Sequence, residues 1–194
     1  MTRIAVIQGH PDSVANHLCH ALADAYAQGA SAAGHEVDIV AVASLEFPLL
    51  RSKDDWLRGE EATPSGLREA QKICTAADHL VLIYPLWLGT MPALLKGFLE
   101  QVFRPGVALG DGRGFPVGLL KGKSARVVVT MGMPALAYRY YFMAHSLKNL
   151  QRNILGFAGI KPIRTTIFGL VENVSEKRSQ KWMHTMRTIG SDAR

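Results

Sequence analysis

Short apolar runs alternate along the chain with longer segments in which apolar residues recur every three or four positions. The apolar runs are long enough for strands, and they cover residues 3–8, 36–42, 79–84, 125–130 and 163–168. Runs with little polar alternation are typical of parallel strands that are buried on both faces. Only the second run alternates clearly, through Glu36 and Asp38, which is the pattern of an edge strand.

The segments between these runs predict helices. They extend over about residues 17–33, 64–77 and 92–104, from the aromatic run 138–142 to about 158, and over 175–189. Pro64 and Pro92 stand where a helix can begin without losing a hydrogen bond, and Glu100 and Arg104 are spaced to form an ion pair. Five strands alternating with five helices predict an α/β fold: one doubly wound parallel sheet with helices on both faces, in a single domain over residues 1–194.

The loop after the third strand is the first candidate binding site. In an open α/β sheet, ligands bind beyond the carboxyl ends of the strands, and there residues 85–91 read PLWLGTM. Trp87 and Leu88, flanked by Pro85 and Gly89, would offer a flat apolar wall and free backbone N–H groups, which suits a planar, partly polar ring system. The same two side chains could instead simply cap the core, and the local chemistry leaves both interpretations open.

The loop after the first strand predicts an anion site. Residues 10–16 lie between a strand and a helix, so free N–H groups and the positive end of the helix dipole would face a phosphate. Ser13, Asn16 and His17 could add side-chain contacts. The loop has neither the glycines of a dinucleotide fingerprint nor a P-loop. Five strands with a first loop of this phosphate-binding type favour the flavodoxin-like strand order 2-1-3-4-5 over the six-stranded dinucleotide fold. His17 and His20 could share a helix face, but no third ligand is spaced to join them, so we expect no metal site.

Composition narrows the class of protein. The chain has 194 residues and a formal net charge of +6, but its basic residues are scattered and no nucleic-acid-binding motif is present. We therefore expect no nucleic-acid partner, while a basic surface would attract anionic substrates such as a phosphorylated dinucleotide. Cys19 and Cys74 form no metal or disulfide pattern, which indicates buried thiols in a reducing compartment and a cytoplasmic protein. Pro85 and Pro92 interrupt the one long apolar stretch, so we expect no membrane insertion.

Two long connections separate predicted elements. Residues 44–62 contain apolar pieces that argue against disorder, and we interpret them as a lid or a subunit contact, with packing against the domain edge as the alternative. Residues 107–123 form a glycine-rich excursion in which residues 111–112 predict a turn.

Four blocks of the sequence resemble the flavodoxin-like NAD(P)H:quinone oxidoreductases, whose relatives include the bacterial modulator-of-drug-activity proteins and the ancillary quinone reductases of potassium efflux systems. The blocks are GHPDS at residues 9–13, YPLWLGTMPALLKGFLEQVF at 84–103, LLKGK at 119–123, and TMGMP with Tyr138 at 130–138. The second block is the specific one. The resemblance covers nearly the whole chain and implies a bound flavin, FAD first and FMN as the alternative. It also implies a homodimer with active sites at the interface, and two-electron transfer.

The resemblance also assigns residues to the flavin. Its phosphate or ribityl chain would lie by His10, Ser13, His17 and Leu18, its isoalloxazine by Pro85, Leu86, Trp87 and Leu88, and its pyrimidine edge by Thr130, Gly132 and Met133. Tyr138 matches the family's active-site tyrosine, and His145 lies one residue from the position of its histidine partner, so these two are the catalytic candidates. The chain departs from the family where His17-Leu18-Cys19 replaces Ser-Phe-Asn and where Met133 follows Gly132 in place of a second glycine.

The implied activity is ping-pong transfer of a hydride. NAD(P)H would reduce the flavin over Trp87 and Leu88, and a quinone, nitro or azo compound would then take the same place. The alternatives are an FMN reductase or azoreductase on the same scaffold, a regulatory partner of a membrane transporter, and a flavodoxin-type electron carrier. Carriers of that kind are typically acidic, whereas this chain is basic.

Overall fold

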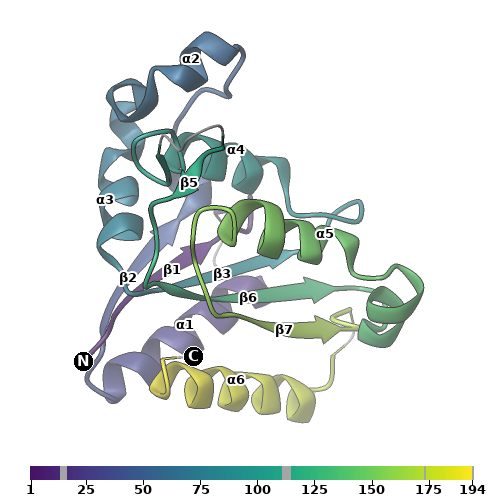
Figure 1. The fold of residues 1–194 in the computed structure, drawn as a ribbon. Coiled ribbons are helices and arrows are strands. Elements are labelled where there is room, and N and C mark those ends of the chain that lie inside the picture. Colours follow the sequence, from purple (N-terminus) through teal and green to yellow (C-terminus); the bar gives the residue numbers. More distant parts are fainter. Residues whose placement is uncertain (14–16, 111–114, 173, 194) are drawn as a thin grey trace.

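A five-stranded parallel sheet forms the centre of the computed structural model, which describes residues 1–13, 17–110, 115–172 and 174–193. The strands are β1 (Arg3–Gln8), β2 (Glu36–Ala41), β3 (His79–Pro85), β6 (Ser124–Met131) and β7 (Ile163–Gly169). Their order is β2-β1-β3-β6-β7, so the predicted fold class and the order 2-1-3-4-5 are confirmed (Figure 1). The chain changes direction across the sheet between β1 and β3, which is the switch point where ligands of such folds bind.

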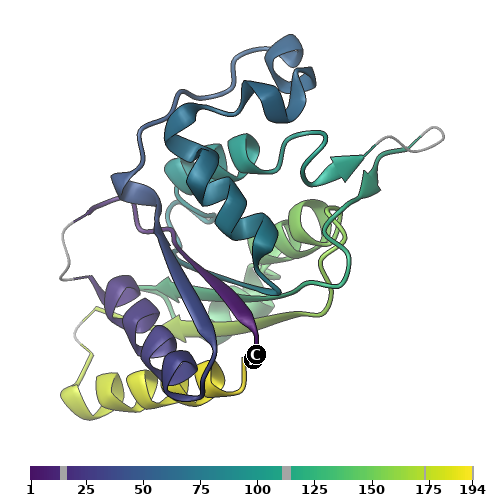
Figure 2. The same ribbon diagram turned by 90° about the vertical axis from the view of Figure 1, so that its left-hand side faces the viewer.

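Helices cover both faces of the sheet (Figures 1 and 2). One face is covered by α1 (Leu18–Ala32) and α6 (Glu176–Ser191), and the other by α3 (Arg68–Ala76), α4 (Ala93–Val102) and α5 (His145–Asn149). Alternate residues of β1 serve the two layers: Ile4 and Val6 pack under α1 and α6, whereas Ala5 and Ile7 belong to the core beneath α3 and α4. In the part of the chain that is described, no helix is both long and apolar enough to cross a membrane.

The two long connections, residues 44–62 and 107–123, contain short helices and strands that the sequence pattern did not predict. Residues 107–123 contain a two-stranded antiparallel hairpin, β4 (Leu109–Gly110) with β5 (Val117–Gly118), while the predicted turn at 111–112 lies outside the described residues. Residues 44–62 contain the short helix α2 (Lys53–Leu57). The long helix expected to reach residue 158 is instead α5 followed by a π-helical segment, Leu150–Leu155.

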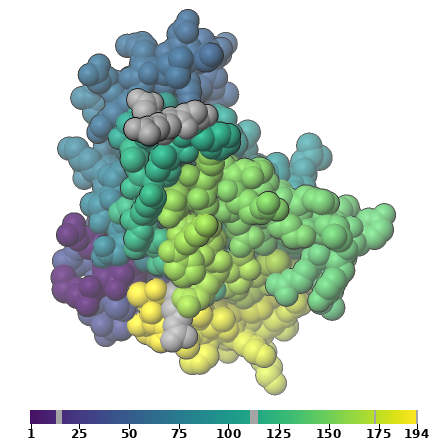
Figure 3. Space-filling view, viewed as in Figure 1, coloured from purple at the N-terminus to yellow at the C-terminus, as the bar shows by residue number. Residues whose placement is uncertain are grey.

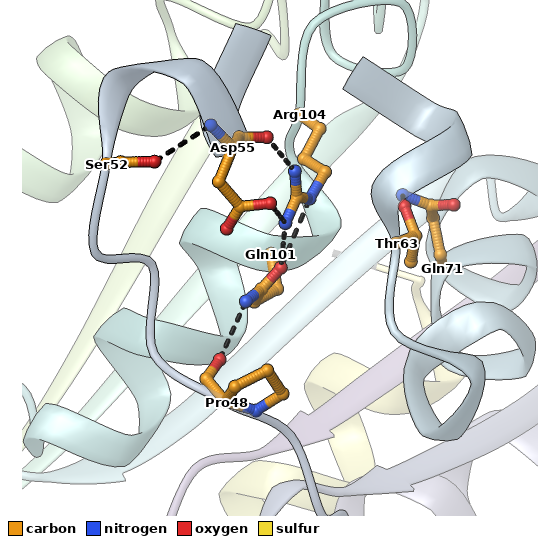
Figure 4. A network of polar contacts seen from close by, with 7 residues as sticks. All are labelled: Pro48, Ser52, Asp55, Thr63, Gln71, Gln101 and Arg104. Atoms are coloured by element: carbon orange, nitrogen blue, oxygen red, sulfur yellow. Dashed lines mark hydrogen bonds and ion pairs between the residues drawn. The ribbon is translucent and has the colours of Figure 1, made fainter. Parts of the chain in front are cut away.

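A buried arginine attaches the α2 segment to the end of α4 (Figure 4). Arg104 is only 1% exposed. Its Nη1 donates to the backbone oxygen of Asp55 at 2.6 Å, and its Nη2 lies 3.5 Å from the Asp55 carboxylate. Gln101 accepts from the same guanidinium and donates through Nε2 to the Pro48 oxygen at 2.7 Å. The predicted pair of Arg104 with Glu100 is therefore wrong: Arg104 turns inward, and Glu100 pairs with Lys96.

Candidate functional site

The carboxyl ends of β1, β3 and β6 bring three loops together at the switch point. Gly9 N–H donates to the Ile83 oxygen at 2.8 Å, and Leu86 N–H donates to the Thr130 oxygen at 2.7 Å. These bonds continue the sheet pairing beyond the strands, so each loop leaves the sheet from a fixed position. Pro85 is buried and Leu86 is half-buried at this edge.

The loop after β3 ends in a tight turn that carries its aromatic side chain outward. Trp87 and Thr90 exchange backbone hydrogen bonds of 2.9 and 3.0 Å, and the two residues between them, Leu88 and Gly89, have φ values of 45° and 81°. Positive φ at both central positions is the pattern of a type I′ turn. A left-handed conformation costs a leucine about 1–2 kcal/mol. Trp87 is 50% exposed and Leu88 is fully exposed, so of the two interpretations that the sequence left open the structure agrees with an apolar wall that faces solvent.

Three histidine rings gather beside this turn. The His10 ring stacks on the His17 ring with their centroids 3.9 Å apart, and the His20 centroid lies within 5.6 Å of both. The Trp87 ring meets His10 at 78° with a centroid distance of 5.8 Å. His17 Nε2 bonds the Asp12 carboxylate at 2.8 Å. The Nδ1 atom of His20 is buried and has no hydrogen-bond partner in the part of the chain that the structure describes. An orphaned buried nitrogen of this kind is expected to bind a polar group brought by a ligand.

The environment keeps two of these histidines neutral. Burial, followed by the nearby His17 ring, lowers the pKa of both His10 and His20 from the ordinary value of 6.5. Neutral imidazoles can donate one N–H each and can take up a proton when an anion binds. No group of three or more possible metal ligands in a suitable arrangement is present among the described residues.

The other predicted phosphate-loop residues lie close to this cluster in the chain. Ser13 is exposed, and Leu18 is half-buried and packs against the core under α1 and α6. Asn16 lies outside the described residues.

The loop after β6 forms the opposite side of the site. Thr130 is buried, and its hydroxyl lies 3.3 Å from the Cys19 sulfur of α1. Gly132 is exposed and Met133 is half-buried. The Glu172 carboxylate approaches Gly132 closely: a Cβ atom at this position would lie 2.9 Å from its Oε1, a contact that a small shift of the Glu172 side chain would relieve. Glu172, which no sequence pattern marks as a site residue, lies after β7 and reaches the loop only through the fold.

The two catalytic candidates occupy one segment but different environments. Tyr138 is 3% exposed, and its hydroxyl bonds the Ser146 hydroxyl at 2.8 Å and accepts from the Leu147 N–H at 3.2 Å. His145 is exposed at the first turn of α5, just after the two positive-φ residues Met143 and Ala144. The tyrosine thus fixes the turn that carries the histidine.

A cavity of about 370 Å³ opens beside the Trp87 turn. Its walls come from that turn, from the first two turns of α4 and from α5, through Trp87, Leu88, Met91, Lys96 and Asn149 among others. The site therefore combines an exposed aromatic turn, a cluster of imidazoles and an open apolar cavity.

Both the sequence and the fold of this chain are similar to those of known proteins. Residues 2–189 match a protein family described by a flavodoxin-like fold. The chain is 28% identical over 174 residues, 89% of its length and 86% of the relative's, to an uncharacterized NAD(P)H oxidoreductase of Haemophilus influenzae. It is 38% identical over 123 residues, 57% of each chain, to FMN-dependent NADH:quinone oxidoreductase 1 of Hahella chejuensis. The structure of an NAD(P)H:quinone oxidoreductase from Methanothermobacter marburgensis superposes with a TM-score of 0.82 at 21% identity, covering 98% of this chain and 96% of the other.

Proposed function

The chain belongs to the family of proteins with a flavodoxin-like fold, and we propose that it is a flavin-dependent NAD(P)H:quinone oxidoreductase. The observation that carries this proposal is the exposed Trp87 turn next to the histidine cluster, at the switch point where flavodoxin, which has the same strand order, binds FMN. The names of the relatives from Haemophilus influenzae and Hahella chejuensis support the same activity.

The residues present fit a flavin mononucleotide. Trp87 and Leu88 offer a flat apolar surface for the ring system. His17 and the unpartnered Nδ1 of His20 offer hydrogen bonds to a phosphate at the start of α1. We propose FMN in place of the FAD that the resemblance put first, because relatives are named for FMN.

The bound flavin would supply the hydride chemistry, and the chain would position and stabilise it. Backbone N–H groups of Gly132 and Met133 would face the edge of the ring that carries negative charge after reduction, where such donors are most effective away from water. His145 would assist as a proton donor, and Tyr138 would act with it by holding the turn on which it lies. Donor and acceptor would occupy the same cavity in turn, which predicts ping-pong kinetics with quinone, nitro or azo acceptors.

An absorbance spectrum of the purified protein, before and after NADH is added under nitrogen, tests this function. We expect flavin bands that bleach on addition of NADH and return when a quinone follows. A protein that takes up neither FMN nor FAD would overturn the proposal, and intersecting double-reciprocal plots would overturn the ping-pong scheme.

A further inference from the structure

Two cavities follow the same side of α4. The first is the cavity beside Trp87, and the second, of about 240 Å³, has apolar walls that include Trp56, Phe103 and Phe157. Lys96 lines both cavities. The two cavities are therefore neighbours on either side of Lys96, with Trp87 in the wall of the first and Trp56 in the wall of the second; we call the pair of cavities the α4 groove.

The middle of the α4 groove is polar. On α4, the Lys96 ammonium donates to the Glu100 carboxylate. On the opposite wall, Asn153 Nδ2 donates to Asn149 Oδ1 at 2.7 Å. Lys96 lines both cavities and Glu100 lines the second. Asn149 lines the first cavity and Asn153 the second. A basic, an acidic and two amide side chains thus lie between two apolar ends.

The dimensions and the polarity pattern restrict the ligand. The helix rises about 16 Å from Pro92, in the first cavity, to Phe103, in the second, at about 1.5 Å per residue. A ligand that fills the groove must be elongated and carry a flat ring at each end, with an anionic, hydroxyl-rich connection between them. A dinucleotide has this arrangement.

The geometry points to the α4 groove as the site of the ADP-ribose half of NADH, an inference that rests on the proposed function because the nicotinamide must reach the flavin at Trp87. Adenine would stack in the cavity of Trp56 and Phe157, and the diphosphate would meet Lys96. Glu100 would accept hydrogen bonds from the ribose hydroxyls. A carboxylate in that role repels a 2′-phosphate, so the groove selects NADH over NADPH.

The Trp56 wall is held in place before any ligand binds (Figure 4). Ser52 caps α2 by accepting from the Asp55 N–H at 3.0 Å, and the buried Arg104 binds both the backbone and the carboxylate of Asp55. Trp56 is the next residue, so its position follows from this network. A preformed aromatic wall binds a base without the entropy cost of ordering a loop.

A shortened hydride donor, which lacks the adenosine of NADH, distinguishes the contributions of the two halves of the α4 groove. With FMN-loaded protein and one quinone, Trp56→Ala should raise the KM for NADH about tenfold, because base–aromatic stacking is worth about 1–3 kcal/mol. The KM for reduced nicotinamide mononucleotide, which lacks the adenosine, should not change. Leu57→Ala is the matched control, since Leu57 is 58% exposed on the same short helix and lines neither cavity. Equal effects on both donors, or a loss of FAD retention in place of an effect on NADH, would overturn the inference.

Removal of the negative charge of Glu100 tests its role in the choice between NADH and NADPH. Glu100→Gln should raise the KM for NADH several-fold and lower that for NADPH, whereas Glu69→Gln, an exposed partner of Lys72 on α3, should change neither. An unchanged ratio of the two KM values would reject the role of Glu100.

A binding measurement with ADP-ribose, which cannot donate a hydride, distinguishes this inference from the proposed function. ADP-ribose titrated by calorimetry into the wild-type protein supplied with FMN should bind, and Trp56→Ala should weaken that binding about tenfold. If NADH reduces no flavin but ADP-ribose binds in this Trp56-dependent way, the groove stands and the reductase proposal fails. If NADH reduces the flavin but ADP-ribose does not bind, the groove is rejected and the reductase proposal stands.

Discussion

The histidine cluster combines two buried imidazoles, His10 and His20, with a more exposed one, His17, and this difference determines what each can contribute. Burial disfavours the charged form of His10 and His20. The cluster therefore offers hydrogen bonds to a phosphate but does not hold three positive charges when no phosphate is bound. His17, which bonds Asp12, is the member closest to solvent.

We expect His17→Ala to weaken FMN binding about tenfold while it leaves riboflavin binding nearly unchanged. The variant removes one hydrogen bond to a charged phosphate, worth about 1.5–3 kcal/mol, and riboflavin has no phosphate. Fluorescence titrations with both flavins measure the difference, and the exposed His184, on α6, supplies the control variant His184→Ala. Equal weakening of both flavins would show that His17 supports the ring system instead of the phosphate.

A different histidine makes stability depend on pH. His79 is 2% exposed at the opposite end of β3, with its Nδ1 bonded to the Ser124 hydroxyl at 2.7 Å and its Nε2 without a partner among the described residues. Burial, followed by the charges of Arg126 and Arg164, lowers its pKa to about 4. Between pH 6.5 and about 4 the unfolded chain therefore holds a proton that the folded chain excludes, and folding weakens as the pH falls through that window.

This loss should reach about 3 kcal/mol at the acid end, at about 1.4 kcal/mol for each unit of pKa difference. Urea unfolding of the wild type and of His79→Gln at pH 7 and pH 4.5 measures it, since contributions of other groups cancel in the comparison. A wild type and a variant that lose equal stability would contradict the burial of a neutral imidazole.

Residue types and spacing predicted the aromatic turn but not the surroundings of its neighbours. Pro85 and Gly89 indicated a loop around Trp87 and Leu88, but whether these two side chains face solvent or cap the core was left open by the local chemistry. The approach of Glu172 to Gly132 depends on where β7 ends relative to β6, and no local pattern encodes that. The inward position of the Tyr138 hydroxyl could not be predicted for a similar reason. Its partner Ser146 follows two residues in the left-handed conformation, Met143 and Ala144, and no periodicity predicts such an interruption of a helix.

At the scale of elements, apolar runs predicted all five strands of the main sheet, because burial on both faces leaves a continuous signal. The two-residue strands of the β4–β5 hairpin are too short to give one. The expected pair of Glu100 with Arg104 failed because the spacing rule considers one helix in isolation. In the folded chain a neighbouring segment offers Arg104 a buried set of acceptors.

We expect Arg104→Gln to lower the free energy of unfolding by about 3 kcal/mol. Removal of one partner from a buried charged network leaves unpaired acceptors, and such losses are typically about 3–5 kcal/mol; the lower end applies because the Asp55 side chain is 35% exposed. Urea unfolding measures the change, and Arg58→Gln, at an exposed position of the same segment, is the control. A loss below about 1 kcal/mol would mean that the network in Figure 4 contributes little to holding the α2 segment on α4.

At the scale of the molecule, the segment between β6 and α5 projects from the side where the strands end (Figure 3). It carries large exposed apolar side chains, which are Leu136, Tyr140, Tyr141, Phe142 and Met143. Contiguous apolar surface of this kind marks an interaction site. It supports a homodimer of the kind that the resemblance to the quinone oxidoreductases implies, in which a partner subunit would complete the site.

Sedimentation equilibrium should therefore give twice the chain mass of 21.2 kDa. Tyr141→Glu, at a residue that is 81% exposed, should shift the protein toward the monomer because a buried charge in an interface is costly. Leu57→Glu, on α2, should not shift it. A wild type that sediments as a monomer at micromolar concentration would reject the dimer.

The Leu88–Gly89 turn has a consequence for attempts to improve this protein in the laboratory. Asn followed by Gly is the preferred pair for such a turn, so a selection for heat resistance is expected to exchange Leu88 for Asn early. Relief of the left-handed leucine should be worth about 1 kcal/mol and raise Tm by about 2–4 °C. The same exchange removes the fully exposed apolar tip beside Trp87, so we expect thermal denaturation to improve while the affinity for flavin falls. Heat-selected and activity-selected lineages should diverge at this one position.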